Sequence, residues 1–236
     1  VGQVLTALAA KVAPGVTTGE LDAVAEGLIT DAGAVPAFKG YHGYPATICA
    51  SVNDEVIHGI PSGRRELQEG DVISIDVGAS LDGYYGDSAV TLAVGAVSEE
   101  AARLLRVTEE ALYKAIEVVR PGGRVSDIGH AVQTHVEGQG FSVVREFVGH
   151  GIGRQMHEEP QVPNYGEPGR GHRLAEGMVL AIEPMVNAGK AAVKVLADGW
   201  TAVTRDHSLS AHFEHTVAVT GEGPRVLTRP ARVLVP

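Results

Sequence analysis

Cysteine is almost absent from this chain, which has only Cys49 among its 236 residues. No intramolecular disulfide can form, and zinc sites built from several cysteines are excluded. Lysine and arginine number 19 against 29 aspartates and glutamates, and the net charge of -10 disfavours a nucleic-acid surface. We found no signal peptide and no apolar run long enough for a membrane helix, so we expect a cytoplasmic protein without membrane association.

The residues that are present have an ordinary globular composition. Hydrophobic residues make up 44% and charged residues 20%, and the chain is long enough to bury a substantial core. The sequence begins at Val1 rather than Met, within an expected helix. This start leaves open whether a native segment precedes it.

An internal repeat organises the chain. Residues 69–76 read E-G-D-V-I-S-I-D, and 107 positions later residues 176–183 read E-G-M-V-L-A-I-E. Pro14-Gly15 and Pro121-Gly122 keep the same offset. Because repeats decide architecture, we predict one catalytic domain built from two α+β halves, approximately 1–118 and 119–236 of 1–236. Chance similarity among short glycine-rich strings is the alternative.

Hydrophobic periodicity predicts the elements of each half. Polar residues before an amphipathic run and glycine after it mark helix ends, with Thr17 or Thr18 and Ser126 as N-cap candidates. Each apolar run with strand periodicity either ends on a carboxylate residue or begins after one. The predicted helices are 17–32, 98–119 and 124–139, and the predicted strands are 72–77, 89–94, 178–186 and 215–220.

Four carboxylates stand in or beside apolar strand-like runs. Asp76 and Glu183 end V-I-S-I-D and V-L-A-I-E, while Asp87 and Glu214 precede S-A-V-T-L and H-T-V-A-V. We align Asp87 with Glu214 as a second repeated position. A single such acid is usually a strand-end cap or an ion pair. Four converging acids repel one another and lose hydration, so they indicate a multivalent cation.

Histidines supply the nitrogen ligand. His150 lies among glycines in G-H-G-I-G, and His58 and His157 lie in V-I-H-G-I-P and M-H-E-E-P. Taken singly, each histidine is more often structural than a ligand. An oxygen-rich set with one imidazole suits Mn, Fe or Co, with Zn as a further option, and two such ions would activate a water for hydrolysis.

Other catalytic patterns are missing. His157-Glu158 begins like a zincin helix, but Gln161 stands where the second histidine belongs and Pro160 would break the helix. The sequence contains no G-x-S-x-G, no Walker A string and no dinucleotide fingerprint. Cys49 as a nucleophile is unsupported, and a packing role is the simpler interpretation.

Several ordered strings together resemble the methionine aminopeptidases of the pita-bread metallopeptidases. They run over most of the chain and read G-Y-H-G-Y-P, N-D-E-V-I-H-G-I-P, I-D-V-G, G-D-S-A, G-H-G-I-G, H-E-E-P, A-I-E-P and F-E-H-T. The short spacing between His157 and Glu183 resembles the minimal type 1 enzymes. The resemblance implies an α+β pita-bread fold: two pseudo-symmetric halves with a curved antiparallel sheet core and flanking helices.

The resemblance also implies roles for the site residues. One metal would be chelated by Asp76 and the other by His150 with Glu183, while Asp87 and Glu214 bridge both. Glu183 would also shuttle the proton of the attacking water. His157 would stabilise the scissile carbonyl oxygen, and His58 would meet the scissile amide. These are the catalytic residues that we expect: His58, His157 and Glu183.

A substrate pocket and a second cation site follow from the same resemblance. An apolar, aromatic and sulfur-containing cleft suits a methionine side chain, and core packing is the alternative for these positions. The expected substrate-binding residues are His58, His157, Tyr41, Tyr44, Cys49, Phe38, Met156, Trp200 and His42. Asn53 and Ser210 resemble a peripheral site for one monovalent cation.

The implied activity is removal of N-terminal methionine from new proteins by two-metal hydrolysis, with a small second residue favoured. The implied cofactors are two divalent ions among Fe, Mn, Co and Zn. The expected partners are peptides and nascent chains that begin with methionine. We expect the enzyme to be a monomer, and association with the ribosome is a further option. The alternatives are another pita-bread enzyme such as an Xaa-Pro dipeptidase, or a non-catalytic peptide-binding module.

Overall fold

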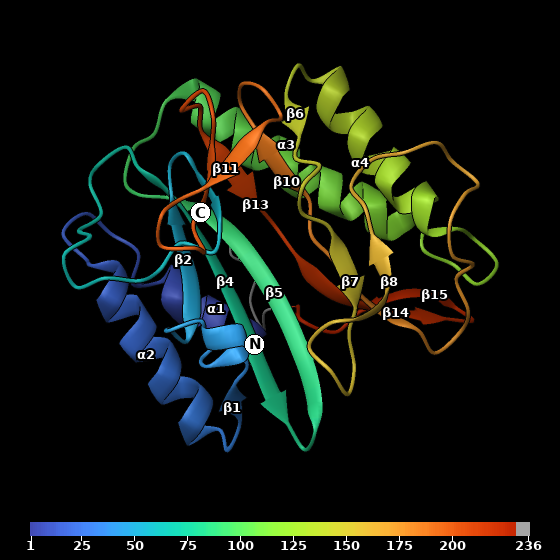
Figure 1. Ribbon diagram of the computed structural model, residues 1–236, viewed down its shortest axis with the longest axis horizontal. Coiled ribbons are helices and arrows are strands. Elements are labelled where there is room, and N and C mark those ends of the chain that lie inside the picture. Colours follow the sequence, from blue (N-terminus) through green and yellow to red (C-terminus); the bar gives the residue numbers. More distant parts are fainter. Residues whose placement is uncertain (230–236) are drawn as a thin grey trace.

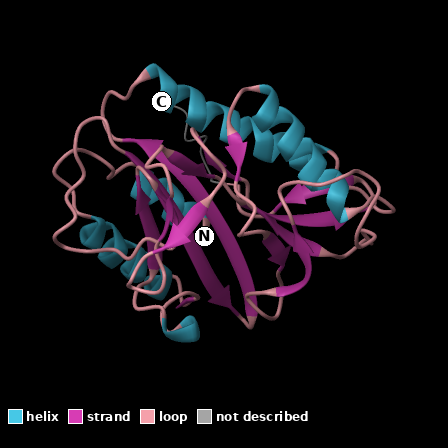
Figure 2. Cartoon of the chain, turned by 45° about the horizontal axis from the view of Figure 1, so that its top comes forward, coloured by secondary structure: helices cyan, strands magenta, loops and turns pink. Residues whose placement is uncertain are grey.

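The computed structural model describes residues 1–229, with strands in the interior and helices on the outside (Figure 1; Figure 2). Within these residues, no helix is both long and apolar enough for a membrane crossing. The helices are α1 (Gly2–Ala9), α2 (Thr18–Asp31), the 3-10 helix η1 (Tyr41–Gly43), α3 (Glu99–Glu117) and α4 (Val125–Gly138).

Helices α2, α3 and α4 confirm the predicted ones, with one wrong cap. Thr17 caps α2 as predicted, because its hydroxyl accepts the Glu20 N–H at 3.2 Å and the Glu20 carboxylate accepts the Thr17 N–H at 2.7 Å. Ser126 does not cap α4, since it lies inside the helix. The Asp127 carboxylate accepts the Arg124 N–H at 2.8 Å and begins this helix instead.

The strands form antiparallel sheets. In the first half, β4 (Val72–Leu81) pairs with β1 (Val35–Pro36), β2 (Ile48–Val52) and β5 (Tyr84–Ala93). In the second half, a five-stranded sheet has the order β15 (Gly223–Val226), β14 (His215–Thr220), β9 (Val179–Ile182), β7 (Gly149–Gly151) and β8 (Glu158–Val162). The two smaller sheets are β13 (Ser210–His212), β10 (Met185–Asn187), β6 (Ser142–Val143) and β11 (Val193–Val195), β12 (Ala202–Thr204), β3 (Glu55–Ile57).

The predicted strand 178–186 is interrupted. It forms β9 and β10, which belong to different sheets, and Glu183 and Pro184 lie between them. Pro184 has no N–H to donate to a neighbouring strand, so the ladder cannot continue through it. Asp87 also differs from expectation, because it lies inside β5 rather than before a strand.

Backbone hydrogen bonds repeat between the halves with the offset of 107. Gly15 N–H donates to the Leu67 carbonyl at 2.8 Å, and Gly122 N–H donates to the Leu174 carbonyl at 2.8 Å. An isolated bridge joins Thr17 to Glu66, and another joins Arg124 to Arg173. These repeated hydrogen bonds support the predicted duplication, which stays a proposal. Residues 230–236 of the predicted second half lie outside the described residues.

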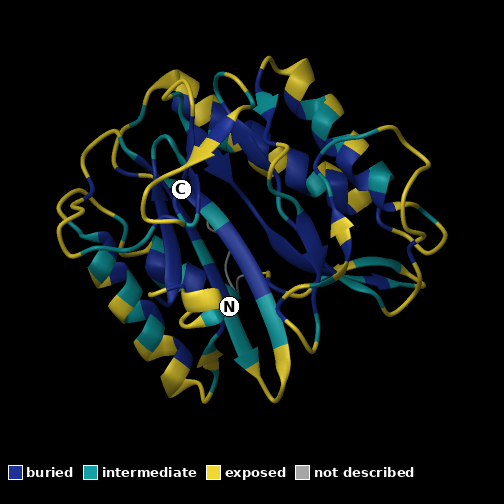
Figure 3. Cartoon of the chain, in the orientation of Figure 1, coloured by how far each residue is buried: buried dark blue, intermediate teal, exposed yellow. Residues whose placement is uncertain are grey.

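Helices cover one face of each of the two larger sheets. Apolar residues of α1 and α2 pack with those of β2 and β4, whereas α3 and α4 pack with β9 and β14. Figure 3 shows the central strands largely in dark blue, with exposed residues mainly in loops and on the outer faces of the helices. The sheets meet where the Glu214 N–H donates to the Ala89 carbonyl at 2.9 Å. This junction between β5 and β14 positions the site.

Candidate metal centre

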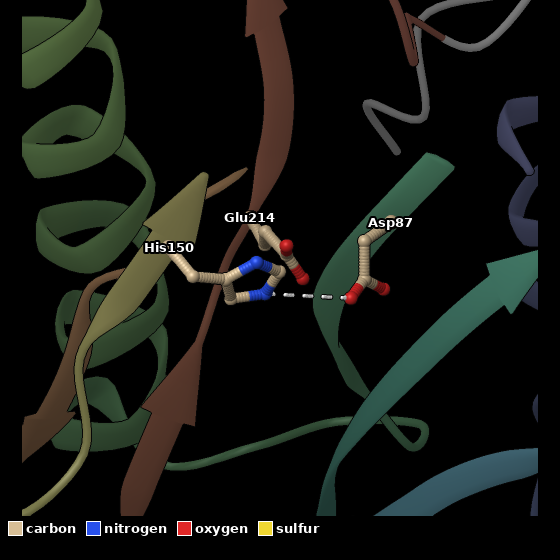
Figure 4. Close-up of side chains that lie close together, drawn as sticks. All are labelled: Asp87, His150 and Glu214. Atoms are coloured by element: carbon tan, nitrogen blue, oxygen red, sulfur yellow. Dashed lines mark ion pairs between the residues drawn. The ribbon is translucent and has the colours of Figure 1, made fainter. Parts of the chain in front are cut away.

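Asp87, His150 and Glu214 form a compact buried group. They come from β5, β7 and the residue before β14, and each offers a ligand atom within 4.8 Å of the others (Figure 4). Their exposed fractions are 4%, 8% and 2%. Strands from both halves therefore bring together two carboxylates and an imidazole that lie far apart in the sequence, as predicted for a metal site.

The His150 ring is oriented for a ligand role. Its Nδ1 lies 2.8 Å from the Gly151 carbonyl oxygen, which can only accept, so the ring proton is on Nδ1. The lone pair of Nε2 is then free, and Nε2 lies 3.9 Å from Asp87 Oδ2 and 3.6 Å from Glu183 Oε1. Burial lowers the pKa of His150 to about 4, which keeps the imidazole neutral.

The carboxylates raise one another's proton affinity. Burial, followed by the charges of Glu214 and Asp76, holds the pKa of Asp87 well above its usual range. The pKa of Glu183 is also raised well above its usual range by burial and by Asp87 and Asp76, and that of Glu214 by burial, Glu183 and Asp76. Burial raises the pKa of Asp76 to about 7. This concentration of negative charge favours a multivalent cation.

Hydroxyl side chains fix the junction at which Asp87 and Glu214 meet. The Ser88 hydroxyl donates to the Glu214 carbonyl at 2.6 Å. The Thr216 hydroxyl accepts the Asp87 N–H at 3.0 Å and donates to the Asp87 carbonyl at 2.7 Å. Both acids are thus anchored through their backbones, and their side chains remain available to a ligand.

The predicted alignment of Asp87 with Glu214 is wrong. Asp87 pairs with Gly78 across β4 and β5, and 107 residues after Gly78, Met185 pairs with His212 across β10 and β13. The repeated partner of Asp87 is therefore His212. His212 was not predicted as a site residue, although it precedes Glu214 by two positions, the spacing that places side chains on one face of a strand.

His157 lies beside this group, and His58 packs against aromatic side chains. The His157 ring centroid is 4.2 Å from that of His150, and its Nδ1 lies 2.8 Å from the Tyr41 hydroxyl. His58 packs edge-on against Phe147 at 5.8 Å between ring centroids. Burial lowers the pKa of His157 and takes that of His58 to about 4. Both rings are thus favoured as neutral hydrogen-bonding groups.

The residues expected to bind methionine form one apolar cluster. It is continuous with the acids, because Cys49 pairs with Asp76 across β2 and β4. Trp200 packs edge-on against Tyr44 at 5.1 Å between ring centroids. The predicted residues in the cluster are Phe38, Tyr41, Tyr44, Cys49, Met156 and Trp200, and it also contains Ala37, Ala46, Ile60, Tyr85, Ile152, Val179 and Ala181.

His42, like His58 and His157, lies outside the apolar cluster. It is exposed, with a positive φ of 48°, and it contacts Tyr41 edge-on at 4.4 Å between ring centroids. The structure therefore places it beside the apolar cluster rather than within it. Its role stays a prediction.

Asn53 and Ser210 are adjacent. The Ser210 N–H donates to the Asn53 carbonyl at 2.9 Å. The Asn53 side chain is used elsewhere, since its amide donates to Asp71 Oδ1 at 2.8 Å and accepts the Val72 N–H at 3.0 Å. The pair predicted for a monovalent cation is thus together, and the cation itself stays a prediction.

A groove adjoins the buried group, because His150 is one of its lining residues. Its volume is about 540 Å³. The full lining is Val148, Gly149, His150, Gln155, His157, Glu158, Glu159 and Gln161.

The comparisons with known proteins agree on one family of metallopeptidases. Metallopeptidase family M24 matches residues 1–221. A methionine aminopeptidase from Clostridium acetobutylicum is 56% identical over 228 residues, which are 97% of this chain and 91% of that protein. Methionine aminopeptidase 1 from Bacillus subtilis is 58% identical over 216 residues, 92% of this chain and 87% of that protein.

Solved structures agree. The crystal structure of methionine aminopeptidase from Rickettsia prowazekii superposes with a TM-score of 0.94 at 46% identity. The superposition covers 96% of this chain and 92% of that one. It confirms the predicted α+β pita-bread fold.

Proposed function

The chain belongs to metallopeptidase family M24, among its methionine aminopeptidases, and we propose that two divalent ions of its reaction are held by Asp76, Asp87, His150, Glu183 and Glu214. Its activity is the hydrolytic removal of N-terminal methionine. One observation carries the metal proposal: the buried ligand atoms of Asp87, His150 and Glu214 lie within 4.8 Å of one another.

The donor atoms fit such ions. Within residues 1–229, Asp76 Oδ1, Asp87 Oδ1 and Glu214 Oε1 are buried without a hydrogen-bond partner. A buried carboxylate oxygen without a partner is costly unless a cation replaces its hydration. The oxygen-rich set with one imidazole suits Fe, Mn, Co or Zn. Bound here, the ions would activate a water molecule for attack on the peptide bond.

Four of the five ligands divide by position. Asp76 would hold one ion on the side of the apolar cluster, where Cys49 is its cross-strand neighbour. His150 would hold the other together with Glu183, whose Oε1 lies 3.6 Å from His150 Nε2. Asp87 is suited to both ions, because its Oδ2 lies 3.9 Å from His150 Nε2 and the charge of Asp76 contributes, after burial, to its raised pKa.

Glu183 takes the proton of the attacking water. Burial raises its pKa well above the usual range, which suits a carboxylate that accepts a proton and then releases it. His157 donates from Nε2 to the scissile carbonyl oxygen, because a Tyr41 hydroxyl that donates to Nδ1 leaves the ring proton on Nε2. His58 contacts the scissile amide.

The apolar cluster receives the methionine side chain. The thioether is flexible and polarisable, and packs favourably against aromatic rings such as those of Tyr44 and Trp200. Its wall next to Asp76 would bring the substrate amine close to Asp76, which would hold one of the ions. This arrangement favours cleavage after the first residue only.

We extend the proposal to the surroundings of the enzyme. Peptides and nascent chains with a small second residue are its substrates, ribosome docking is an option, and it acts as a cytoplasmic monomer. A monovalent cation binds the carbonyl oxygens near Asn53 and Ser210. The two halves, 1–118 and 119–236, form one catalytic domain, which the repeated hydrogen bonds support.

A peptide panel tests the specificity. The protein, dialysed against chelator and resupplied with Co²⁺ or Mn²⁺, is expected to release methionine from Met-Ala-Ser and to leave Leu-Ala-Ser and Met-Lys-Ser nearly uncleaved. The Xaa-Pro dipeptidase alternative predicts faster cleavage of Ala-Pro than of Met-Ala-Ser. Peptide binding without methionine release would favour the non-catalytic module.

A further inference from the structure

His212 is a buried imidazole that the proposed reaction does not use. Its exposed fraction is 2%, and within residues 1–229 its Nε2 has no hydrogen-bond partner. This nitrogen points into the site, since it lies 3.8 Å from Glu183 Oε2. An unpartnered buried nitrogen beside a carboxylate is costly unless the two groups interact, directly or through water.

The backbone of His212 is held rigidly. The Thr91 hydroxyl accepts the His212 N–H at 2.8 Å and donates to the His212 carbonyl at 2.8 Å. Thr91 is itself held, because its hydroxyl lies 2.8 Å from that of Ser74. The ring therefore extends from a fixed point on β13 toward Glu183.

Glu183 lies between two imidazoles. Its Oε1 is 3.6 Å from His150 Nε2 and its Oε2 is 3.8 Å from His212 Nε2. The residue occupies the break between β9 and β10, where the Asn164 side-chain amide donates to its carbonyl at 2.9 Å. This bond holds the backbone of Glu183, and the orientation of its carboxylate depends on the side chains around it.

We propose that His212 is a positioning residue whose Nε2–H holds Glu183 Oε2, so that Oε1 stays turned toward His150 and the ions. This inference rests on the proposed role of Glu183. Shortening the present distance to a hydrogen bond requires a shift of about 1 Å. When one carboxylate oxygen is held by a hydrogen bond, the other oxygen keeps a fixed direction. Hydrogen-bond partners of metal ligands usually orient them in this way.

Three variants separate this role from simple packing. His212→Leu keeps much of the volume and removes the donor, His212→Gln keeps a donor at similar reach, and His212→Asn has a donor that is too short. The matched control is His135→Leu, because His135 also contacts a glutamate, Glu110, at 3.0 Å but lies on α4. All four proteins are compared as Co²⁺-loaded enzymes with Met-Ala-Ser.

We expect His212→Leu and His212→Asn to lower kcat about 10- to 100-fold with KM changed less than about twofold. His212→Gln is expected to recover most of kcat, and His135→Leu to keep it. The visible absorption spectrum of bound Co²⁺ should change in His212→Leu while the number of bound ions stays the same. If the His212→Leu protein does not fold, the kcat values of His212→Gln and His212→Asn provide the test.

Three results would overturn the inference: unchanged kcat in His212→Leu or His212→Asn, a His212→Gln enzyme as slow as its Asn counterpart, or the loss of a bound ion from any of these variants. Glu183→Gln keeps the two inferences apart. If it inactivates the enzyme while the His212 variants remain active, only the positioning role fails. If Glu183→Gln turns over normally, the proposed role of Glu183 fails as well.

Discussion

Asp87 and His212 are held by the same hydrogen-bond pattern. The Thr216 hydroxyl binds both backbone groups of Asp87, at 3.0 and 2.7 Å, and the Thr91 hydroxyl binds both backbone groups of His212, each at 2.8 Å. One repeated position thus carries an acid in the first half and an imidazole in the second. The pseudo-symmetric scaffold therefore holds an asymmetric set of groups, which makes the two proposed ion positions inequivalent.

Thr216→Val should lower both stability and metal affinity. The substitution leaves the buried Asp87 N–H without its acceptor, which costs about 1–3 kcal/mol of unfolding free energy. Urea denaturation measures this loss, and Co²⁺ titration measures the affinity. In Thr204→Val, a buried hydroxyl that donates to the Ser208 carbonyl at 2.8 Å is removed instead. That control should lose stability and keep its Co²⁺ affinity; equal affinities for all three proteins would contradict the anchoring role of Thr216.

Asp87→Asn should have opposite effects on the metal-free and the metal-loaded protein. Asp87 is buried beside Glu214 and Asp76, and its loss of hydration, followed by their repulsion, destabilises the metal-free fold. Neutralising it should raise the melting temperature in chelator and lower it in saturating Mn²⁺, with methionine release abolished. Scanning calorimetry in both buffers makes the comparison. A lower melting temperature in chelator would show that repulsion does not dominate this site.

Tyr41→Phe should slow the enzyme less than His157→Ala. Loss of the hydroxyl removes the hydrogen-bond partner of His157 Nδ1, whereas loss of the imidazole removes the proposed donor itself. A donor of this kind contributes about 10²–10³ in kcat. Steady-state kinetics with Met-Ala-Ser should show the decrease in kcat for both variants. An effect confined to KM would assign His157 to substrate binding alone.

The sequence predicted the helices and the metal-ligand candidates for local reasons. Thr17 begins α2 through a reciprocal cap with Glu20, an interaction between residues three positions apart. The motif G-H-G-I-G indicated His150, whose tautomer is set by the next residue, Gly151. Interactions between residues this close together in the chain can be predicted from the sequence.

The features that were wrong or missed depend on partners distant in the sequence. The strand through Glu183 was expected to continue, but Pro184 ends it and the chain enters another sheet. Asp87 was aligned with Glu214 because the flanking letters are similar. The position of His212 follows only from strand pairing and from Thr91, which lies 121 residues earlier.

Asp206 predicts a pH-dependent part of the stability. Its carboxylate accepts the Lys190 N–H at 2.7 Å and the Ser208 hydroxyl at 2.7 Å, and these bonds lower its pKa from 3.8 to about 2. A carboxyl whose pKa is lowered by folding stabilises the fold above its unfolded pKa. That contribution disappears as the pH falls from about 4 to 2.

Asp206→Asn should therefore melt at a lower temperature than the unmodified protein at pH 7. The difference should shrink as the pH falls from about 4 toward 2, because the lost contribution is then absent from both proteins. Circular dichroism melts at a series of pH values provide the measurement. A difference that is constant with pH would show that Asp206 stabilises the turn without its charge.

The most direct test of the metal centre is the number of ions that the protein needs. Chelator-treated protein would be titrated with Co²⁺ by calorimetry while methionine release from Met-Ala-Ser is followed in parallel samples. We expect two ions per chain at saturation, activity only when metal is present, and loss of both ion binding and activity in Glu214→Gln. Full methionine release by metal-free protein, or unchanged ion binding in Glu214→Gln, would contradict the assignment of the buried carboxylates as metal ligands.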